Sequence, residues 1–206
     1  MIFWGAGTAR TLRPIWVAEE LGVSYLLHPI GPRTGETQTD NYTQLNPKQK
    51  VPFCEDGDLK ISETMAICRY LVNKYGSEET LFTPGSIEEQ AKEDEWLAFI
   101  FGELDETSLY VMRRHGALAS IYGEAPTAME AAEEYVIRQL KVIKKHMQDR
   151  QYVLNERFSL PDVFLTTCLN WVNAYEIEMP EILEKYRQRI VERDAYRKAV
   201  KVNNPD

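Results

Sequence analysis

The order of hydrophobic patterns along the chain limits its fold more than any other feature. Residues 1–76 alternate between strand-like and helix-like patterns, whereas the later residues are helical in pattern. A short apolar segment, Ile2–Trp4, is followed by a helical pattern over Leu12–Leu21 and a strand-like pattern over Ser24–His28. Two strands joined through a helix predict a βαβ unit with parallel strands.

The second half of this region predicts an antiparallel hairpin and a helix. After an irregular stretch from Ile30 to Thr39, two apolar segments, Val51–Cys54 and Leu59–Ile61, flank the turn Glu55-Asp56-Gly57-Asp58. A helix is expected from about Glu63 to Tyr75. The complete order predicts an α/β domain with a small mixed sheet, thioredoxin-like in outline.

A change of composition predicts a domain boundary near residue 80. The segment before residue 87 is polar and contains Thr83-Pro84-Gly85, and Ser86-Ile-Glu-Glu89 has the pattern of a capping box. We therefore expect a thioredoxin-like domain over residues 1–77, a linker over 78–86 and an all-helical domain over 87–206.

Two long helices are expected to begin the second domain. The pattern over Ile87–His115 predicts a helix about 43 Å long at about 1.5 Å per residue. Thr127-Ala-Met-Glu130 is expected to cap the second helix. That helix carries one apolar stripe, made of Val136, Leu140, Ile143 and Met147.

The segment Val163–Tyr175 is expected to be the buried centre of the second domain, because its apolar residues surround most of the helix. Ser159 is predicted to cap this helix, Pro161 falls in its first turn, and Asp162 is placed to bond back to the cap. We assign these residues a structural role and no chemistry.

Composition excludes several classes of function. The formal charge of −8, from 24 basic and 32 acidic side chains, disfavours nucleic acid and anionic membrane surfaces as partners. Residues 1–76 carry eight side chains of each sign, so an anionic ligand would meet less repulsion there. The three cysteines form neither a disulfide framework nor a metal-binding spacing, and no apolar run predicts secretion or membrane insertion. We expect a cytoplasmic protein without a metal.

Two motifs resemble the glutathione-binding half of cytosolic glutathione transferases. The first is Asn46-Pro-Lys-Gln-Lys-Val-Pro52, and the second, at the family's spacing, is Ile61-Ser-Glu-Thr-Met-Ala-Ile-Cys-Arg-Tyr-Leu71. Glu19-Glu20-Leu21-Gly22 and Arg157-Phe-Ser-Leu-Pro-Asp162 extend the likeness over nearly the whole chain. The chain is most similar to serine/threonine-type members such as the bacterial theta-like and nu-like enzymes.

The resemblance implies a site for glutathione as co-substrate. Pro52 would follow a cis peptide bond, and Val51 would pair with the cysteinyl backbone of the ligand. Alternatively, Val-Pro only blocks pairing at a strand edge, because proline has no N–H. Gln49 and Lys50 would meet the glycyl carboxylate, for which Arg33 is a weaker candidate.

Glu63 and Thr64 open a helix whose N–H groups and positive dipole end suit the γ-glutamyl carboxylate. By the resemblance, Glu63 would accept the ammonium of the same group and the Thr64 hydroxyl would add a bond. The alternative is that Ser62 or Thr64 only caps this helix.

The expected chemistry needs a hydrogen-bond donor to the glutathione sulfur, because a thiol with a pKa of about 8.5 is mostly protonated at neutral pH. Relatives use a tyrosine in the first strand, where this chain has Trp4, or a hydroxyl or thiol before the first helix. Thr8 falls at that second position, and Arg10 and Thr11 are rivals for the contact. Thr8 could also serve only as a helix cap. A cysteine nucleophile is not expected, since Ala9 follows Thr8.

The leading hypothesis is therefore a glutathione transferase that conjugates glutathione to a small electrophile, with a role in detoxification. A glutathione-dependent isomerase or reductase would use the same binding residues, and a non-catalytic binding protein of the same fold is a third reading. The resemblance also implies a homodimer.

Overall fold

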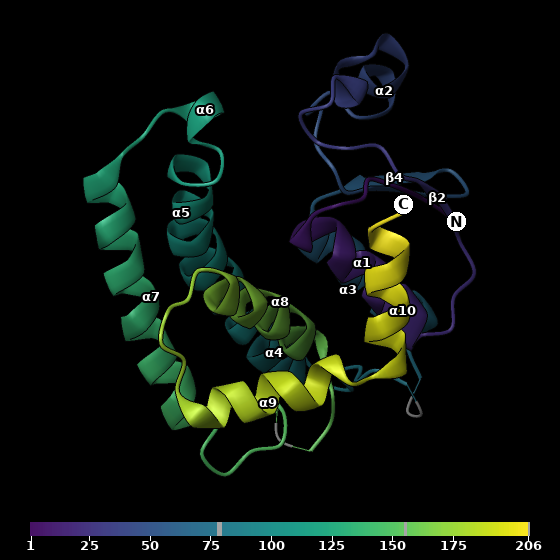
Figure 1. Cartoon of the computed structure of the whole chain (residues 1–206). Coiled ribbons are helices and arrows are strands. Elements are labelled where there is room, and N and C mark those ends of the chain that lie inside the picture. The colour runs from purple at the N-terminus through teal and green to yellow at the C-terminus, as the bar shows by residue number, and fades with distance from the viewer. Residues whose placement is uncertain (78–79, 155, 206) are drawn as a thin grey trace. The chain divides into compact units, whose positions relative to one another are not determined.

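The computed structural model describes residues 1–77, 80–154 and 156–205, and the chain divides into two compact units (Figure 1). The first unit combines Met1–Thr83 with Glu192–Asp206, and the second is Pro84–Val191. The first unit is α/β and the second is helical, which confirms the predicted fold class. The sequence pattern predicts a second domain that includes all of residues 87–206, whereas Glu192–Asp206 groups with the first unit.

A mixed four-stranded sheet organises the first unit. Its strands are β1 (Ile2–Trp4), β2 (Leu26–His28), β3 (Phe53–Asp56) and β4 (Leu59–Ser62), in the order β2-β1-β3-β4. Strand β1 runs parallel to β2 and antiparallel to β3, with Trp4 opposite both His28 and Phe53. The parallel pair and the hairpin of β3 and β4 agree with the predicted order of elements.

Helices cover both sides of this sheet. Helices α1 (Ala9–Glu20) and α3 (Thr64–Tyr75) lie on one side, and α2 (Asp40–Leu45) lies on the other (Figure 1). A 3-10 turn, η1 (Glu36–Gln38), precedes α2. The short helix α2 is not predicted from the sequence, because six residues give too little periodicity to reveal a helix.

The hairpin turns at Gly57 and Asp58, as its sequence predicts, and the φ angle of +62° at Gly57 is one that glycine adopts without strain. The ladder begins at Phe53 rather than Val51, since Pro52 has no N–H to contribute. Asp56 ties the hairpin to α3, because its carboxylate accepts hydrogen bonds from three donors: Tyr70 Oη at 2.7 Å, Tyr75 Oη at 2.7 Å and Lys74 Nζ at 2.6 Å. These bonds hold the pKa of Asp56 far below its usual value.

The last helix, α10 (Asp194–Asn203), packs against α1 (Figure 1). Arg193 binds Glu20 through two hydrogen bonds of 2.7 and 2.6 Å. The rings of Trp16 and Tyr196 meet edge to face, with their centroids 4.8 Å apart. These contacts explain why the C-terminal segment belongs to the first unit. They join residues more than 170 positions apart, so the local sequence pattern could not reveal them.

The second unit consists of helices on both flanks of a buried one. Ser86 caps its first helix by accepting the Glu89 N–H at 3.1 Å, as predicted. The helices are α4 (Ile87–Phe99), the π-helical η2 (Ile100–Leu109), α5 (Tyr110–His115), α6 (Ala119–Tyr122), α7 (Pro126–His146), α8 (Leu160–Ala174) and α9 (Glu181–Val191). Among the described residues, no helix is both long and apolar enough to span a membrane.

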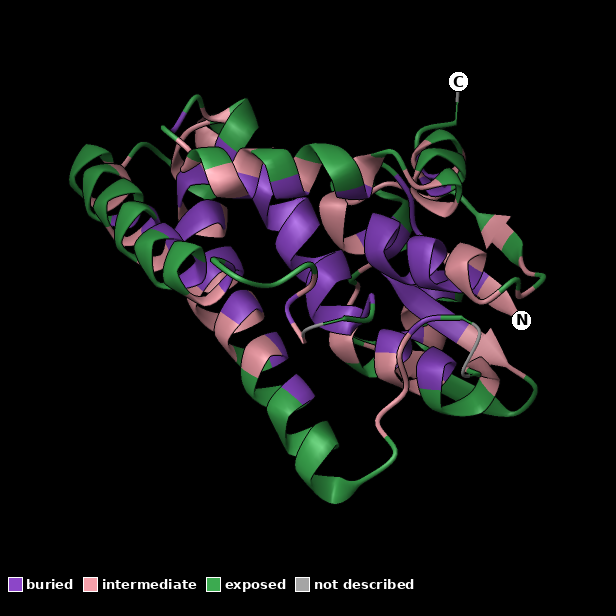
Figure 2. Cartoon of the chain, turned by 90° about the horizontal axis from the view of Figure 1, so that it is seen from below, coloured by how far each residue is buried: buried purple, intermediate pink, exposed green. Residues whose placement is uncertain are grey.

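Helix α8 is the centre of this unit, as the sequence predicts. Eleven of its residues are buried, whereas the peripheral helices are buried on one side and exposed on the other (Figure 2). The Asp162 carboxylate accepts hydrogen bonds from four donors: Ser159 N at 2.9 Å, Ser159 Oγ at 2.7 Å, Val153 N at 2.9 Å and Tyr186 Oη at 2.7 Å. The predicted bond from Asp162 back to the cap is therefore present.

Two details differ from the sequence analysis. Helix α7 begins at Pro126 with Ala125 as its N-cap, so Thr127 lies inside the first turn and does not cap the helix. Proline suits that first position, because its fixed φ angle is already helical and its missing N–H needs no partner. The helical path over residues 87–115 is uninterrupted, but its middle third has π-helical hydrogen bonds.

Gly5 gives a direct test of packing in the first unit. Its φ angle is +114°, and an added Cβ would lie 2.5 Å from the Cβ of Val51 and 2.9 Å from Thr11 Cγ2. We expect Gly5→Ala to lower the free energy of unfolding by about 3 kcal/mol, from backbone strain and overpacking together. Gly57→Ala is the control, since a Cβ there meets nothing within 4 Å, and it should cost about 1 kcal/mol. Urea denaturation measures both, and equal losses would contradict the packing argument.

Asp162 gives a corresponding test of the second unit. Asp162→Ala leaves four buried donors without their acceptor, and we expect the free energy of unfolding to fall by about 3 kcal/mol or more. Asp149→Ala, at an exposed position, should change it by less than about 0.5 kcal/mol. A change in Asp162→Ala as small as that of the control, in urea denaturation, would rule out the structural role.

Candidate functional site

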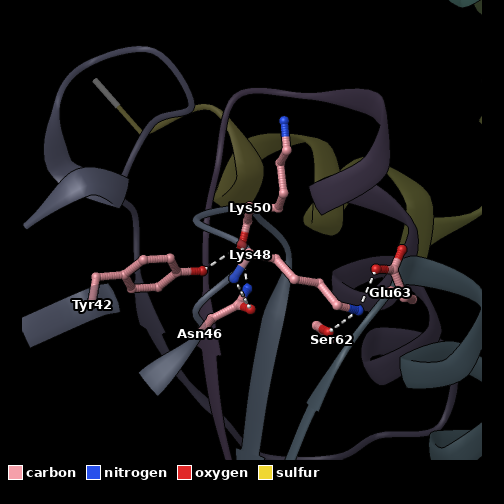
Figure 3. Close-up of polar contacts among 6 residues, drawn as sticks. All are labelled: Tyr42, Asn46, Lys48, Lys50, Ser62 and Glu63. Carbon is pink, nitrogen blue, oxygen red and sulfur yellow. Dashed lines mark hydrogen bonds and ion pairs between the residues drawn. The ribbon is translucent and has the colours of Figure 1, made fainter. Parts of the chain in front are cut away.

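Buried side chains hold the loop between α2 and β3 in one conformation. The carbonyl oxygen of Lys50 accepts two hydrogen bonds, from Tyr42 Oη at 2.6 Å and from Asn46 Nδ2 at 2.8 Å (Figure 3). Asn46 also accepts the Lys48 N–H at 3.2 Å, which makes a local turn. Burial raises the pKa of Tyr42, so its phenol remains a donor at neutral pH. The loop is therefore positioned before any ligand arrives.

The Val51–Pro52 peptide bond at the end of this loop is cis, as the family resemblance implied. Pro52 is buried and Val51 is half-buried. Gly5, at the end of β1, lies directly against Val51, since even a methyl group there would overlap it. Val51 thus lies against the segment that connects β1 to α1.

The N-terminus of α3 is not capped by a side chain. Its N-cap residue is Glu63, whose own side chain makes no capping hydrogen bond, so the alternative in which Ser62 or Thr64 caps the helix is wrong. The first N–H groups of a helix have no partner within the helix, and the dipole there favours negative charge. Thr64 is buried, and its hydroxyl donates to the carbonyl oxygen of Arg10 over a long 3.4 Å. The start of α3 is chemically suited to an anion.

Lys48 joins the loop to the start of α3. Its ammonium lies 2.7 Å from Glu63 Oε1 and 3.0 Å from Ser62 Oγ (Figure 3). Both charged side chains are more than half exposed, and an exposed ion pair contributes at most about 1 kcal/mol. This contact shows that Glu63 can hold an ammonium group in this position, and that Lys48 can be displaced from it at little cost.

The other predicted binding residues lie on the same loop or before it. Gln49 directs its amide to Thr43 Oγ1 at 3.0 Å, and the exposed Lys50 side chain extends away from the other labelled residues (Figure 3). Arg33 is exposed in the turn before η1. The described residues include four non-glycine positions with positive φ, and three of them, Arg33, Gln49 and Glu63, are binding candidates; the fourth is Glu176. Such conformations gather at functional sites.

Thr8 is the N-cap of α1. Its hydroxyl oxygen accepts the Thr11 N–H at 3.0 Å, and the Thr8 N–H is bound in turn by Thr11 Oγ1 at 3.0 Å. The capping interpretation is therefore correct for Thr8, although a cap that accepts through its oxygen still has its hydroxyl hydrogen to donate. In β1, the Trp4 indole stacks on His28 and donates to Glu55, so the strand offers no phenol.

The rival hydroxyl of Thr11 is used within the protein. Thr11 is buried, and its hydroxyl has two acceptors, Asn203 Oδ1 at 2.7 Å and the Thr8 carbonyl oxygen at 2.9 Å. Because a hydroxyl carries one hydrogen, Thr11 has none left for a ligand. Thr8 is a half-exposed residue, and its hydroxyl hydrogen can turn either to Thr11 Oγ1 at 3.0 Å or outward.

The cysteines do not offer a competing nucleophile. Cys54, Cys68 and Cys168 are buried thiols that form no disulfide with one another. Burial, with the nearby Asp56 charge, raises the pKa of Cys54 to about 12, and burial raises that of Cys68 as well. In the ranges that the structure describes, no three His, Cys, Asp or Glu side chains are grouped so that they could hold a metal ion.

Four residues of this region were not identified as functional from sequence: Tyr42, Asn46, Lys48 and Asn203. Asn46 precedes a proline in the loop motif, and asparagine at such a position is a turn signal that could have found it. Tyr42 and Asn203 carry no local signal, because each meets its partner only through the fold.

Comparisons with known proteins agree on one family. The family model for the N-terminal domain of glutathione S-transferases matches residues 1–73, and that for the C-terminal domain matches residues 87–194. Glutathione S-transferase theta-1 of Bos taurus is 28% identical over 165 residues, which cover 78% of this chain and 68% of the relative. Glutathione S-transferase F9 of Arabidopsis thaliana is 26% identical over 166 residues, which cover 78% and 75%.

Solved structures give the same result. The theta class glutathione S-transferase of Xanthomonas axonopodis pv. citri, crystallised with glutathione bound, is 26% identical with a TM-score of 0.79, and the match covers 97% of this chain and 96% of that one. A glutathione transferase homologue from Lodderomyces elongisporus has a TM-score of 0.87 at 21% identity, covers 98% of each chain and supports the fold. The resemblance found in the sequence is confirmed: the chain belongs to the glutathione S-transferase family.

Proposed function

We propose that this protein is a glutathione S-transferase that binds glutathione on its first unit and directs the thiolate at a small electrophile. The observation that carries this proposal is the start of α3, where an uncapped helix N-terminus lies beside a carboxylate, Glu63, that already holds an ammonium. A helix N-terminus attracts a carboxylate, and Glu63 attracts a cation. Together they suit the zwitterionic end of an amino acid, which is the chemistry of the γ-glutamyl group.

The rest of the peptide would lie along the loop before β3. In the proposed pose, the backbone of Val51, before the cis bond to Pro52, pairs with the cysteinyl residue. Gln49 and Lys50 then face the glycyl carboxylate, with Thr64 adding to the γ-glutamyl end. The network of Tyr42 and Asn46 supports this arrangement, because a loop that is already ordered loses little entropy when it binds.

Thr8 is proposed as the catalytic residue. Its hydroxyl hydrogen is the one in the Thr8–Thr11 pair that can turn outward. A hydrogen bond to a charged group contributes about 1.5 to 3 kcal/mol, which is roughly one to two pKa units of a thiol. One such bond brings a thiol with an ordinary pKa of about 8.5 close to neutrality. The sulfur of glutathione then attacks the electrophile, whose leaving group departs with the electron pair.

The alternatives gain less support. A reductase that used its own thiol would need an accessible cysteine, and all three cysteines are buried. A glutathione-dependent isomerase would use the same binding residues and differ only in the second substrate. We also propose, from the family alone, a cytoplasmic homodimer that acts in detoxification.

Thr8→Ala tests the catalytic assignment. Loss of the hydrogen bond to the thiolate should lower kcat/KM with a model aryl halide about 10- to 150-fold, while the Kd for glutathione changes less than about threefold. Thr8→Ser keeps the hydroxyl and should retain most of the activity. Unchanged kinetics in Thr8→Ala would remove Thr8 from the mechanism.

Absence of glutathione binding to the unmodified protein at millimolar ligand, in isothermal titration calorimetry, would overturn the proposed function.

Glu63→Gln tests the zwitterion site. Removing the charge that faces the γ-glutamyl ammonium should raise the Kd for glutathione about tenfold in the same titration. Lys48→Met is the matched comparison: Lys48 competes with the ligand ammonium for Glu63, so its loss should leave the affinity unchanged or higher. Equal weakening in both variants would mean that Lys48 binds the ligand and that the ammonium site is wrongly assigned.

A further inference from the structure

The side chain and carbonyl of one residue in α10 bind the segment that carries Thr8. Asn203, near the end of α10, is only 3% exposed. Its Nδ2 donates to the Thr8 carbonyl oxygen at 3.2 Å, and its Oδ1 accepts from the Thr11 hydroxyl at 2.7 Å. Its own carbonyl oxygen accepts the Gly7 N–H at 2.7 Å. The three bonds reach residues 7, 8 and 11, nearly 200 positions earlier in the chain.

We propose that Asn203 is a positioning residue for thiolate stabilisation, which acts by holding Thr8 and Thr11 so that the Thr8 hydroxyl hydrogen is directed to the ligand sulfur. This inference rests on the proposed function, because it assigns a role relative to the sulfur of bound glutathione. Asn203 itself does not touch the ligand in this arrangement; it acts through the other two residues.

The number of hydroxyl hydrogens on Thr8 and Thr11 supports the positioning role of Asn203. Thr11 Oγ1 receives the Thr8 N–H and donates its only hydrogen, for which Asn203 Oδ1 is the nearest acceptor. Thr8 Oγ1 receives the Thr11 N–H. An oxygen that accepts a hydrogen bond becomes a better donor, since hydrogen bonds in a chain polarise one another. With the Thr11 hydrogen committed to Asn203, the Thr8 hydrogen is the one that remains for the sulfur.

An amide side chain is suited to this position because it both donates and accepts. Leucine would do neither, and aspartate would accept from Thr11 but would direct a second carboxylate oxygen at the Thr8 carbonyl. The negative charge of aspartate would also oppose a thiolate nearby. Of the common side chains of this size, asparagine can satisfy both Thr8 O and the Thr11 hydroxyl.

The docking of α10 does not depend on Asn203 alone. The beginning of the helix is held by the paired bonds of Arg193 to Glu20, and Lys198 lies 2.5 Å from Glu19. Ala199 in α10 is fully buried, and the ring pair of Trp16 and Tyr196 also joins α10 to α1. Variants of Asn203 should therefore fold, and the position of α10 can be perturbed separately through Arg193.

The test measures the pKa of the bound thiol in Asn203→Leu and Asn203→Asp, from the ultraviolet absorption of the thiolate against pH in the glutathione complex of the full chain. We expect the thiolate fraction at pH 7 to fall about threefold to tenfold, as for the loss of one hydrogen bond, and kcat to fall in proportion while KM changes little. The pH profile of kcat should move to higher pH. Asn203→Asp, which keeps the shape of the side chain, should raise the thiol pKa at least as much as Asn203→Leu.

Two control variants separate positioning from stability. Asn204→Leu removes the neighbouring exposed asparagine at the C-cap of α10, whose side chain donates to the Val200 carbonyl oxygen in that helix, and should leave the thiol pKa unchanged. Arg193→Ala should lower the melting temperature and also leave the thiol pKa unchanged. If the Asn203 variants lower the melting temperature but keep the thiol pKa of the unmodified protein, Asn203 is structural and the proposal is overturned.

A double-mutant cycle with Thr11→Val completes the test. Because Asn203 and Thr11 act through the same hydroxyl, Asn203→Leu and Thr11→Val together should shift the thiol pKa hardly more than either alone. Additive shifts would overturn the proposed route through Thr11. Failure of the proposed function is distinguishable, since it would appear as absence of glutathione binding to the unmodified protein. An unchanged thiol pKa in Thr8→Ala would remove Thr8 from the mechanism, whatever the Asn203 variants do.

Discussion

The close contact of Gly5 with Val51 and Thr11 is the constraint on which the candidate site depends. A side chain at Gly5 would occupy the space of both neighbours, so the end of β1 can approach the loop before β3 only because this residue has no Cβ. That approach brings the cis Val51–Pro52 peptide next to the first turn of α1. The residue proposed to pair with the ligand backbone and the residue proposed to face its sulfur thus come from segments more than 40 positions apart.

The site is assembled mainly from backbone groups held by buried side chains. Tyr42 and Asn46 order the loop through one carbonyl, and Asn203 orders the start of α1 through two carbonyl or hydroxyl oxygens and one N–H. The proposed anion site at α3 likewise uses helix N–H groups. Such groups need no charge of their own, so a chain with a net charge of −8 can bind an anionic peptide where its local charges balance.

In the second unit, local sequence signals predict some helix starts correctly and others not. The sequence Ser159-Leu-Pro-Asp162 predicted the start of α8 and the return bond of Asp162, because a capping box lies within four residues. The prediction that Thr127 caps α7 was wrong, since α7 already begins at Pro126. The π-helical middle of the path from residue 87 to 115 was not predicted, because hydrophobic periodicity does not distinguish it from an α-helix.

By itself, the sequence determined the order of the four strands and of helices α1 and α3 in the first 76 residues, although not the short helix α2. It also determined the hairpin at Gly57, the buried helix α8, the family and the set of candidate site residues. Those conclusions rest on short-range patterns and on motifs whose residues are close together in the sequence. Only the tertiary structure decided that residues 192–206 belong with the first unit, that Lys48 meets Glu63, and that the Thr11 hydroxyl is already bound by Asn203. The physical reason is that these are contacts between segments distant in sequence, and no local propensity encodes which distant partner a side chain will meet.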